Sequence, residues 1–277
     1  MNNQPETNKI VIKPTKGWQL VNLKELIQYK DLLYFLTIRG IKAKYAQSVL
    51  GIGWAIIQPL FSAIVFTVVF GRLANVDSYG VPYILFSYLG MLPWLYFSNT
   101  LNEASNSLVA NANMITKVYF PRLVLPLSAA FSKLLDFIIG FIILIGLTIY
   151  FNYVPGISLL ALPLLIIILL LASLGAGMLL ASLSVQYRDV KHALSFMVQL
   201  MMYATPVVYS TSAVPAKYQA LYAINPMVGV IEGFRAVFTN TPLPWTLIYP
   251  GIICSIILFV AGILFFKRME KTFADVA

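Results

Sequence analysis

The sequence has very few of the residues that build disulfide frameworks, metal sites or catalytic acid–base pairs. It contains one cysteine (Cys254) and one histidine (His192) in 277 residues, with only 10 aspartates and glutamates. A single cysteine excludes an intramolecular disulfide, and these two residues cannot supply the usual four zinc ligands. We therefore expect no metal site, no bound cofactor and no catalytic residues in this chain.

Motifs for nucleotide hydrolysis and for common hydrolases are also missing. The chain has no G-x-x-x-x-G-K-[ST] loop, no G-x-S-x-G elbow, no H-E-x-x-H pair and no EF-hand pattern. Without the phosphate-binding loop, the chain does not hydrolyse ATP by the P-loop route. Transport is therefore favoured over catalysis.

Charged residues are scarce and apolar residues are abundant. The hydrophobic set makes up 60% of the chain, charged residues make up 10%, and the mean hydropathy is +0.83. Soluble domains carry about 45–50% apolar and about 25% charged residues. Because so few polar groups could not cover a water-facing surface, the chain is an integral membrane protein.

Membrane spans follow from the apolar runs, since a spanning helix needs about 20 predominantly apolar residues. Six segments qualify, the fifth being short: 49–70, 82–101, 123–151, 159–185, 193–208 and 245–266. We predict an all-α protein with a six-span domain over 49–277, preceded by a cytoplasmic tail and interfacial helices over 1–48. An amphipathic helix at the membrane surface is predicted for 20–45, with a cytosolic linker helix as the alternative.

The positive charge is distributed unevenly between the two sides of this topology. All but three of the 19 lysines and arginines (Arg72, Lys217 and Arg235) fall on one side of the six spans. The positive-inside rule then places both termini in the cytoplasm. The net charge of +9 is therefore a topology signal, and we expect no nucleic-acid partner.

Two short apolar segments lie between the fifth and sixth spans, on the external side. They are 215–224 and 226–238, and Pro215 and Pro226 suit the first turns of helices. Each is too short to cross a bilayer. We predict two short helices that dip into the outer leaflet, beside a pathway that tolerates irregular backbone.

The loop between the second and third spans becomes apolar after a stretch rich in Asn and Ser. The apolar residues are Met114-Ile115 and Val118-Tyr119-Phe120, followed by Pro121. Exposed apolar residues on a soluble-facing segment indicate a docking surface. A helix packed on the inner ends of the spans is the alternative.

The amino-acid sequence of this loop also resembles that of a known family. The run Ile115-Thr-Lys-Val-Tyr-Phe-Pro-Arg122 resembles the corresponding loop of the type-2 ATP-binding-cassette permeases that export bacterial O-antigen, capsule or teichoic acid. Similar runs occur in order along the chain: Gly51-Ile-Gly-Trp54 through Gln58-Pro59, Leu92-Pro-Trp94, Tyr187-Arg-Asp189, Pro206-Val-Val-Tyr209, and Asn225-Pro-Met through Glu232-Gly-Phe-Arg235.

The resemblance implies a homodimer in the bacterial inner membrane, with two separate ATPase subunits that bind ATP and Mg²⁺ and a lipid-linked polysaccharide as substrate. It implies a coupling helix at about 105–120 and an external gate at about 215–238. The implied coupling residues are Asn106, Asn113, Met114, Ile115, Lys117, Tyr119, Phe120, Arg122, Arg188 and Asp189. The implied gate residues are Pro206, Pro215, Asn225, Pro226, Glu232 and Arg235.

Two charge pairs and one aromatic stripe allow more than one interpretation. Glu232 and Arg235 are one helical turn apart. They could form an ordinary ion pair, or they could hold the external gate closed. Lys133 and Asp136 have the same spacing, and we expect them to neutralise each other near the membrane interface. The aromatic stripe of the second span could line a polymer channel or pack against helices and lipid; its members are Tyr83, Phe86, Trp94 and Phe97.

Two other functions compete with this one. An ion-coupled secondary transporter would need ionisable residues at the membrane midplane and an inverted repeat, and only Lys133 and Asp136 are available. A membrane enzyme acting on lipid-linked sugars would need clustered acids, whereas Asp77, Glu103 and Glu232 are isolated in the sequence.

Overall fold

Helices form every regular element in the part of the chain that the computed structural model describes, residues 23–46, 48–187, 189–270 and 273. This confirms the all-α prediction, while the expected tail at 1–17 lies outside the described residues. In chain order the elements are α1 (Leu23–Gln28), α2 (Lys30–Tyr45), α3 (Gly53–Phe66), π-helix η1 (Thr67–Leu73), α4 (Tyr83–Ala110), α5 (Ala112–Lys117), α6 (Val124–Tyr150), 3-10 helix η2 (Ile157–Ala161), α7 (Leu162–Gln186), α8 (Val190–Tyr203), 3-10 helix η3 (Thr211–Ala213), α9 (Ala216–Tyr222), α10 (Pro226–Thr239) and α11 (Trp245–Met269).

Four helical segments are long and apolar enough to cross a membrane. They are α3 with η1 (Gly53–Leu73), α6, η2 with α7 (Ile157–Gln186), and α11. These segments coincide with the first, third, fourth and sixth predicted spans. The second and fifth predicted spans, in α4 and α8, do not meet both criteria of length and hydropathy.

Helix α4 falls short in hydropathy because it lies at the centre of the bundle. It packs against α3, α6, α7 and α10, and 19 of its 28 residues are buried. Small polar residues such as Ser98, Ser105 and Ser107 donate hydrogen bonds to carbonyls of their own helix, which lets neighbouring helices approach closely. A helix enclosed by protein does not need the apolar surface of a lipid-facing one.

Helix α8 falls short in length. Its 14 residues extend about 21 Å, less than the hydrocarbon core of about 30 Å. The helix ends at Tyr203, and the residues that follow, 204–209, form turns rather than a continuing helix. The fifth predicted span is therefore not one continuous helix, and the count of six spans stays a prediction.

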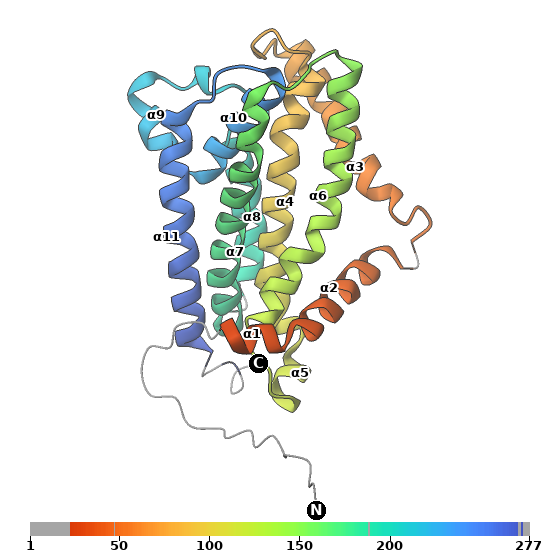
Figure 1. Ribbon diagram of the computed structural model, residues 1–277, viewed down its shortest axis with the longest axis vertical. Coiled ribbons are helices and arrows are strands. Elements are labelled where there is room, and N and C mark those ends of the chain that lie inside the picture. Colours follow the sequence, from red (N-terminus) through yellow and green to blue (C-terminus); the bar gives the residue numbers. More distant parts are fainter. Residues whose placement is uncertain (1–22, 47, 188, 271–272, 274–277) are drawn as a thin grey trace, which may run out of the picture.

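The bundle has two distinct ends (Figure 1). Helices α1 and α5 and the beginning of α2 lie at the end called here the α5 end, and α9 and α10 lie at the opposite, α10 end. The largest cluster of buried apolar side chains joins α4, α6, α7 and α10, and a second cluster lies near α5. The predicted interfacial helix is two helices, and α2 slants along the outside of the bundle against α6.

Candidate functional site

Helix α5 projects from one end of the bundle (Figure 1) and differs in extent from the predicted coupling helix. Residues 105–110 belong to the last turns of α4, and α5 is confined to 112–117. The break occurs at Asn111, whose backbone leaves the helical region at φ −115° and ψ 22°, while its amide side chain caps the carbonyl of Ser107 at 2.8 Å. The predicted coupling range of 105–120 therefore covers the last turns of α4, the break at Asn111, and α5 with the residues that follow it.

The segment that holds most of the predicted coupling residues, together with Val118 of the apolar patch, has an exposed set and a buried set. Lys117, Val118 and Tyr119 are exposed, whereas Ile115 and Phe120 are buried in the core cluster beneath α5. The buried pair anchors the segment, and the exposed residues form its outer surface. Of the remaining candidates, Asn113 and Asp189 are exposed, Asn106, Met114 and Arg122 are half-buried, and Arg188 lies outside the described residues.

Hydrogen bonds tie the segment after α5 to α1 and to the end of α11. The hydroxyl of Tyr119 donates to a carboxylate oxygen of Glu25 at 3.1 Å. The Arg122 guanidinium donates to the Glu270 carbonyl, and the Arg122 amide donates to the Glu270 carboxylate at 3.3 Å. A movement of this segment would therefore act on both α1 and α11.

Burial and a neighbouring carboxylate both shift the pKa of Tyr119. Partial burial, followed by the hydrogen bond to Glu25, raises the pKa of the Tyr119 phenol above its usual value of 10. Nearby, Arg39 of α2 donates to the side-chain oxygen of Asn111 at 2.8 Å. The carboxylate of Glu270 also pairs with Lys267 at 2.7 Å. The contacts of Tyr119 and Arg39 are exposed to solvent.

At the opposite end, α10 is a core helix rather than a peripheral one. Thirteen of its 14 residues, Pro226–Phe238, are buried, and it packs against α4, α7 and α11. Its start is fixed as the sequence predicts, with Pro226 in the first turn and the side chain of Asn225 accepting from the Met227 amide at 3.1 Å. The helix ends at Asn240, which adopts the left-handed conformation with φ 55°.

Arg235 joins α10 to the segment that follows α8. Its Nη1 donates to the Glu232 carboxylate at 2.8 Å and to the Tyr209 carbonyl at 3.1 Å, and its Nη2 donates to the Val207 carbonyl at 2.9 Å. The side chains of Arg235 and Glu232 are only 4% and 7% exposed. The predicted pair is confirmed, but it is buried and shared with backbone carbonyls, unlike an ordinary surface ion pair.

Helix α4 completes this cluster with an aromatic ring and a glycine. The ring of Phe86 lies 3.7 Å from the Arg235 guanidinium carbon, which adds a cation–π contact. A β-carbon on Gly90 would lie 2.6 Å from the Val207 carbonyl oxygen, so only glycine allows this approach. Sequence reasoning missed the role of Gly90, for which a lone glycine inside an aromatic-rich span was the available signal.

Helix α9 is short and largely exposed, in contrast to α10. Pro215 precedes it and is exposed, whereas Pro206, in the turn after α8, is buried. The hydroxyls of Tyr209 and Tyr222 lie 2.7 Å apart, and Asn225 donates to the Thr205 hydroxyl at 3.0 Å. These bonds connect the turn after α8 to the α9–α10 junction.

The aromatic stripe of the second predicted span is largely internal to the bundle. Phe86, Trp94 and Phe97 are buried, and Tyr83 is half-buried with its hydroxyl donating to the Val208 carbonyl. The reason is that α4 has neighbours on most sides, so its aromatic face packs against protein. Within one protomer the stripe therefore packs against other helices, and its role as a channel lining stays a prediction.

The predicted pair of Lys133 and Asp136 is wrong in its partners. Lys44 Nζ of α2 binds Asp136 Oδ2 at 2.6 Å, and the Tyr45 hydroxyl also donates to Asp136. Lys133 Nζ lies 3.1 Å from Glu103 Oε2 of α4. Neighbouring helices offer closer partners than the adjacent turn does.

In the described part of the chain, no group of three or more His, Cys, Asp or Glu residues could hold a metal ion.

Comparisons with known proteins show the family of this chain. The model of the family described as ABC-2 type transporter matches residues 31–239. The O-antigen export system permease protein RfbA of Klebsiella pneumoniae is 30% identical over 253 residues, which cover 89% of this chain and 95% of that protein. Its namesake from Myxococcus xanthus is 28% identical, with 90% and 96% covered.

A more distant relative is named for a different cargo. The polysialic acid transport protein KpsM of Escherichia coli is 22% identical over 202 residues, which cover 71% of this chain and 77% of that protein. The family match spans α2 to α10, and so includes both the α5 segment and the Arg235 cluster. The chain belongs to the ABC-2 type transporter family.

Proposed function

We propose that this chain is the permease subunit of an ATP-driven exporter that moves a lipid-linked polysaccharide from the cytoplasm across the bacterial inner membrane. Family membership supports a transport role. The names of its relatives, which cover O-antigen and polysialic acid export, support a polysaccharide cargo. The chain lacks a P-loop for ATP, so ATP and Mg²⁺ would bind to a separate ATPase subunit.

In this proposal the working assembly contains two copies of the chain and two ATPase subunits. Each copy would span the membrane six times, with both termini and the α5 end in the cytoplasm. The turn after α8, together with α9 and α10, would form the external gate. The pathway for the polymer would lie between the two copies, which is consistent with the closely packed interior of one protomer.

The observation that carries the proposal is the exposed surface formed by Lys117, Val118 and Tyr119 after α5. Apolar side chains that project from the end of a bundle favour a protein partner. The hydrogen bonds of this segment to α1 and α11 offer a route by which a partner's movement reaches the spans. We therefore assign the coupling role to α5 and to the residues up to Arg122.

The test compares two exposed valines at opposite ends of the molecule. Val118 and Val154 are 59% and 79% exposed, so aspartate at either position should leave folding intact. In vesicles that contain the chain and its ATPase, Val118→Asp should reduce ATP-dependent glycan export at least about ten-fold, because a buried interface tolerates an unpaired charge poorly. Val154→Asp should export normally, and normal export by Val118→Asp would contradict the coupling role.

Ion-coupled transport is the second candidate and makes an opposite prediction. Its carrier groups would be Lys133 and Asp136, but both are engaged by other residues, Glu103 and Lys44. In the same vesicles, export should require ATP and continue when proton and sodium gradients are collapsed. Export that stops on collapse of a gradient and ignores ATP would favour the secondary transporter.

A further inference from the structure

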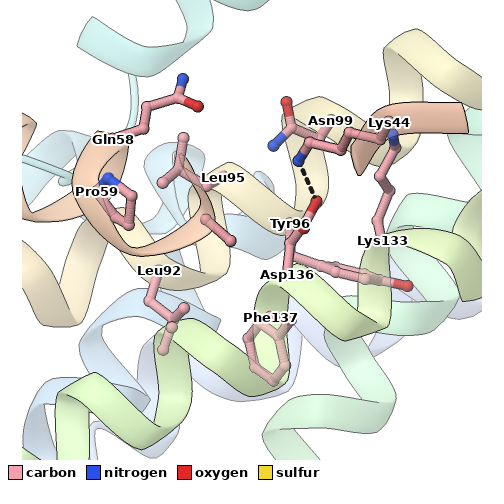
Figure 2. Close-up of a pocket in the computed structure, with 12 residues that line it drawn as sticks. Lys44, Gln58, Pro59, Leu92, Leu95, Tyr96, Asn99, Lys133, Asp136 and Phe137 are labelled. Carbon is pink, nitrogen blue, oxygen red and sulfur yellow. Dashed lines mark hydrogen bonds and ion pairs between the residues drawn. The ribbon is translucent and has the colours of Figure 1, made fainter. Parts of the chain in front are cut away.

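A recess lies between α2, α3, α4 and α6 (Figure 2), and its lining includes no residue of the α5 surface or of the Arg235 cluster. The space in it that a water-sized molecule can enter is about 40 Å³, and the rest of the recess opens to the surroundings, so it is a shallow groove that can hold part of a larger molecule. In the close-up, Gln58 of α3 lies on one side, and Asn99, Lys44 and Asp136 lie on the other. The recess therefore presents polar groups on facing walls.

The lining changes in polarity along the bundle axis. Helices α4 and α6 are antiparallel neighbours, so Asn99 and Lys133 lie nearer the α5 end, while Leu92 and Gly140 lie deeper in the bundle. Polar and charged residues thus occupy the part near the α5 end, and apolar residues occupy the deeper part. A molecule with a charged head and an apolar tail matches this gradient.

Several polar groups in the recess can accept a new partner. The side chains of Gln58 and Asn99 make no hydrogen bond within the described part of the chain. Pro59 has no N–H, so the carbonyl of Ala55, which also lines the recess, lacks its usual helical donor. These groups suit the ester and hydroxyl groups of a lipid headgroup region.

The charge of the recess centres on Lys133. Its side chain is 13% exposed, and its partner Glu103 is 53% exposed, so this carboxylate could return to water when another anion arrives. An ammonium has three donors, of which Glu103 engages one at 3.1 Å. Asp136, by contrast, is already bound by Lys44 and Tyr45. An incoming anion would therefore exchange with Glu103 on Lys133.

Helices α4 and α6 are in contact at the deep end of the recess, which limits what can occupy it. A β-carbon on Gly140 would lie 2.6 Å from Leu92 Cδ1, so α4 and α6 touch there. A polymer in transit could not pass this contact, whereas a molecule that remains bound could end at it. The recess is thus suited to a resident molecule and does not form part of a through pathway.

We propose that this recess binds one anionic phospholipid per protomer, with the headgroup phosphate on Lys133 and an acyl chain beside Pro59, Leu92 and Leu95. The positive charge of Lys133 and the change in polarity along the recess favour an anionic lipid. The contact between α4 and α6 at the deep end favours a phospholipid that stays bound over the lipid-linked glycan that is transported. This proposal requires that the chain lies in a lipid membrane, but it does not depend on which molecule the chain transports.

The test titrates short-chain phosphatidylglycerol into the purified full-length chain in detergent and counts bound lipids by native mass spectrometry. Wild type should bind one lipid per protomer at saturation. Lys133→Gln should weaken binding at least about ten-fold, because a charge-assisted contact is lost, and Lys133→Arg should retain it. Lys191→Gln, an exposed lysine on α8 outside the recess, should bind as wild type does.

Folding is monitored by the thermal unfolding midpoint of each variant in lipid-free detergent. If Lys133→Gln is unstable, Gln58→Phe provides a second test, since its exposed position on α3 tolerates a ring that would fill the recess. Unchanged lipid binding in both variants, or binding that never saturates, would overturn the proposal.

Competition experiments with other lipids identify which class of phosphate-bearing lipid binds in the recess. Diacylglycerol, which lacks the phosphate, and phosphatidylethanolamine, which is zwitterionic, should compete poorly with phosphatidylglycerol. Displacement by a polyprenyl phosphate at lower concentration than phosphatidylglycerol, lost in Lys133→Gln, would instead make the recess a carrier-lipid site and reject a resident phospholipid. Export in vesicles, measured separately, tests the proposed function without reference to this site.

Discussion

The two ends of the molecule use similar polar contacts in opposite surroundings. At the α10 end, the side chains of Glu232 and Arg235 are less than a tenth exposed, and the guanidinium also binds two backbone carbonyls. At the α5 end, the bonds of Tyr119 and Arg39 face solvent. Buried charges are costly to unpair, whereas exposed pairs are worth little. In this energetic sense we call the α10 end fixed and the α5 end adjustable: opening the proposed gate would have to break buried contacts, whereas the contacts of Tyr119 and Arg39 can be exchanged with water.

The largest effect should come from removing the cation at the fixed end. Arg235→Met leaves Glu232 buried without its partner and removes donors from the Val207 and Tyr209 carbonyls. We expect a loss of about 3–5 kcal/mol in the free energy of unfolding, measured by chemical denaturation in mixed micelles.

A double variant separates the charge from the packing at this position. Glu232→Gln combined with Arg235→Met should recover part of the stability, because no buried carboxylate remains unpaired. If Arg235→Met alone cost less than about 1 kcal/mol, the contrast between the two ends would be lost.

A methyl group at Gly90 should have the next largest effect. The added carbon would press on the Val207 carbonyl at 2.6 Å and on Arg235 Nη2 at 2.9 Å. Overpacking against backbone costs about 1–3 kcal/mol, to be measured in the same denaturation assay. Gly146→Ala in α6 is the matched control, since its β-carbon would meet nothing within 4 Å. Equal stability of the two variants would show that the close approach at Gly90 is unimportant.

Removing one phenol hydroxyl at each end gives the smallest and most direct comparison. Tyr119→Phe loses an exposed hydrogen bond to Glu25 and should cost less than about 1 kcal/mol. Tyr222→Phe loses the bond between the half-buried Tyr209 and Tyr222 hydroxyls and should cost about 1–2 kcal/mol. Both are read from the unfolding midpoint at constant denaturant slope, and the reverse order would contradict the assignment of fixed and adjustable ends.

Much of the chain organisation could be predicted from local signals. Pro226 and Asn225 fix the start of α10, and long apolar runs locate α3, α6, α7 and α11, because these signals act within a few residues. The Glu232–Arg235 pair was predictable for the same reason, since the two residues lie one turn apart on a single helix.

The errors arose where tertiary contacts decide the outcome. Lys133 and Asp136 bind residues 30 or more positions away, on α2 and α4. The end of α8 at Tyr203 is set by turns that pack on Arg235, which hydropathy does not reveal. The aromatic stripe of α4 left two interpretations open for the same reason, since only the neighbouring helices show that most of this helix is buried within the protomer. Neither periodicity nor composition contains this information.

One helix connects the fixed and adjustable ends, and its hydrogen-bond ladder has a gap. Helix α4 runs unbroken for 28 residues, about 42 Å, from the Arg235 cluster to the base of α5. Pro93, near its middle, cannot donate to the Leu89 carbonyl. A force that bends α4 from either end would act mainly at Pro93, where this backbone hydrogen bond is missing. Helix α4 is therefore expected to bend most easily near Pro93, between the Arg235 cluster at one end and the base of α5 at the other.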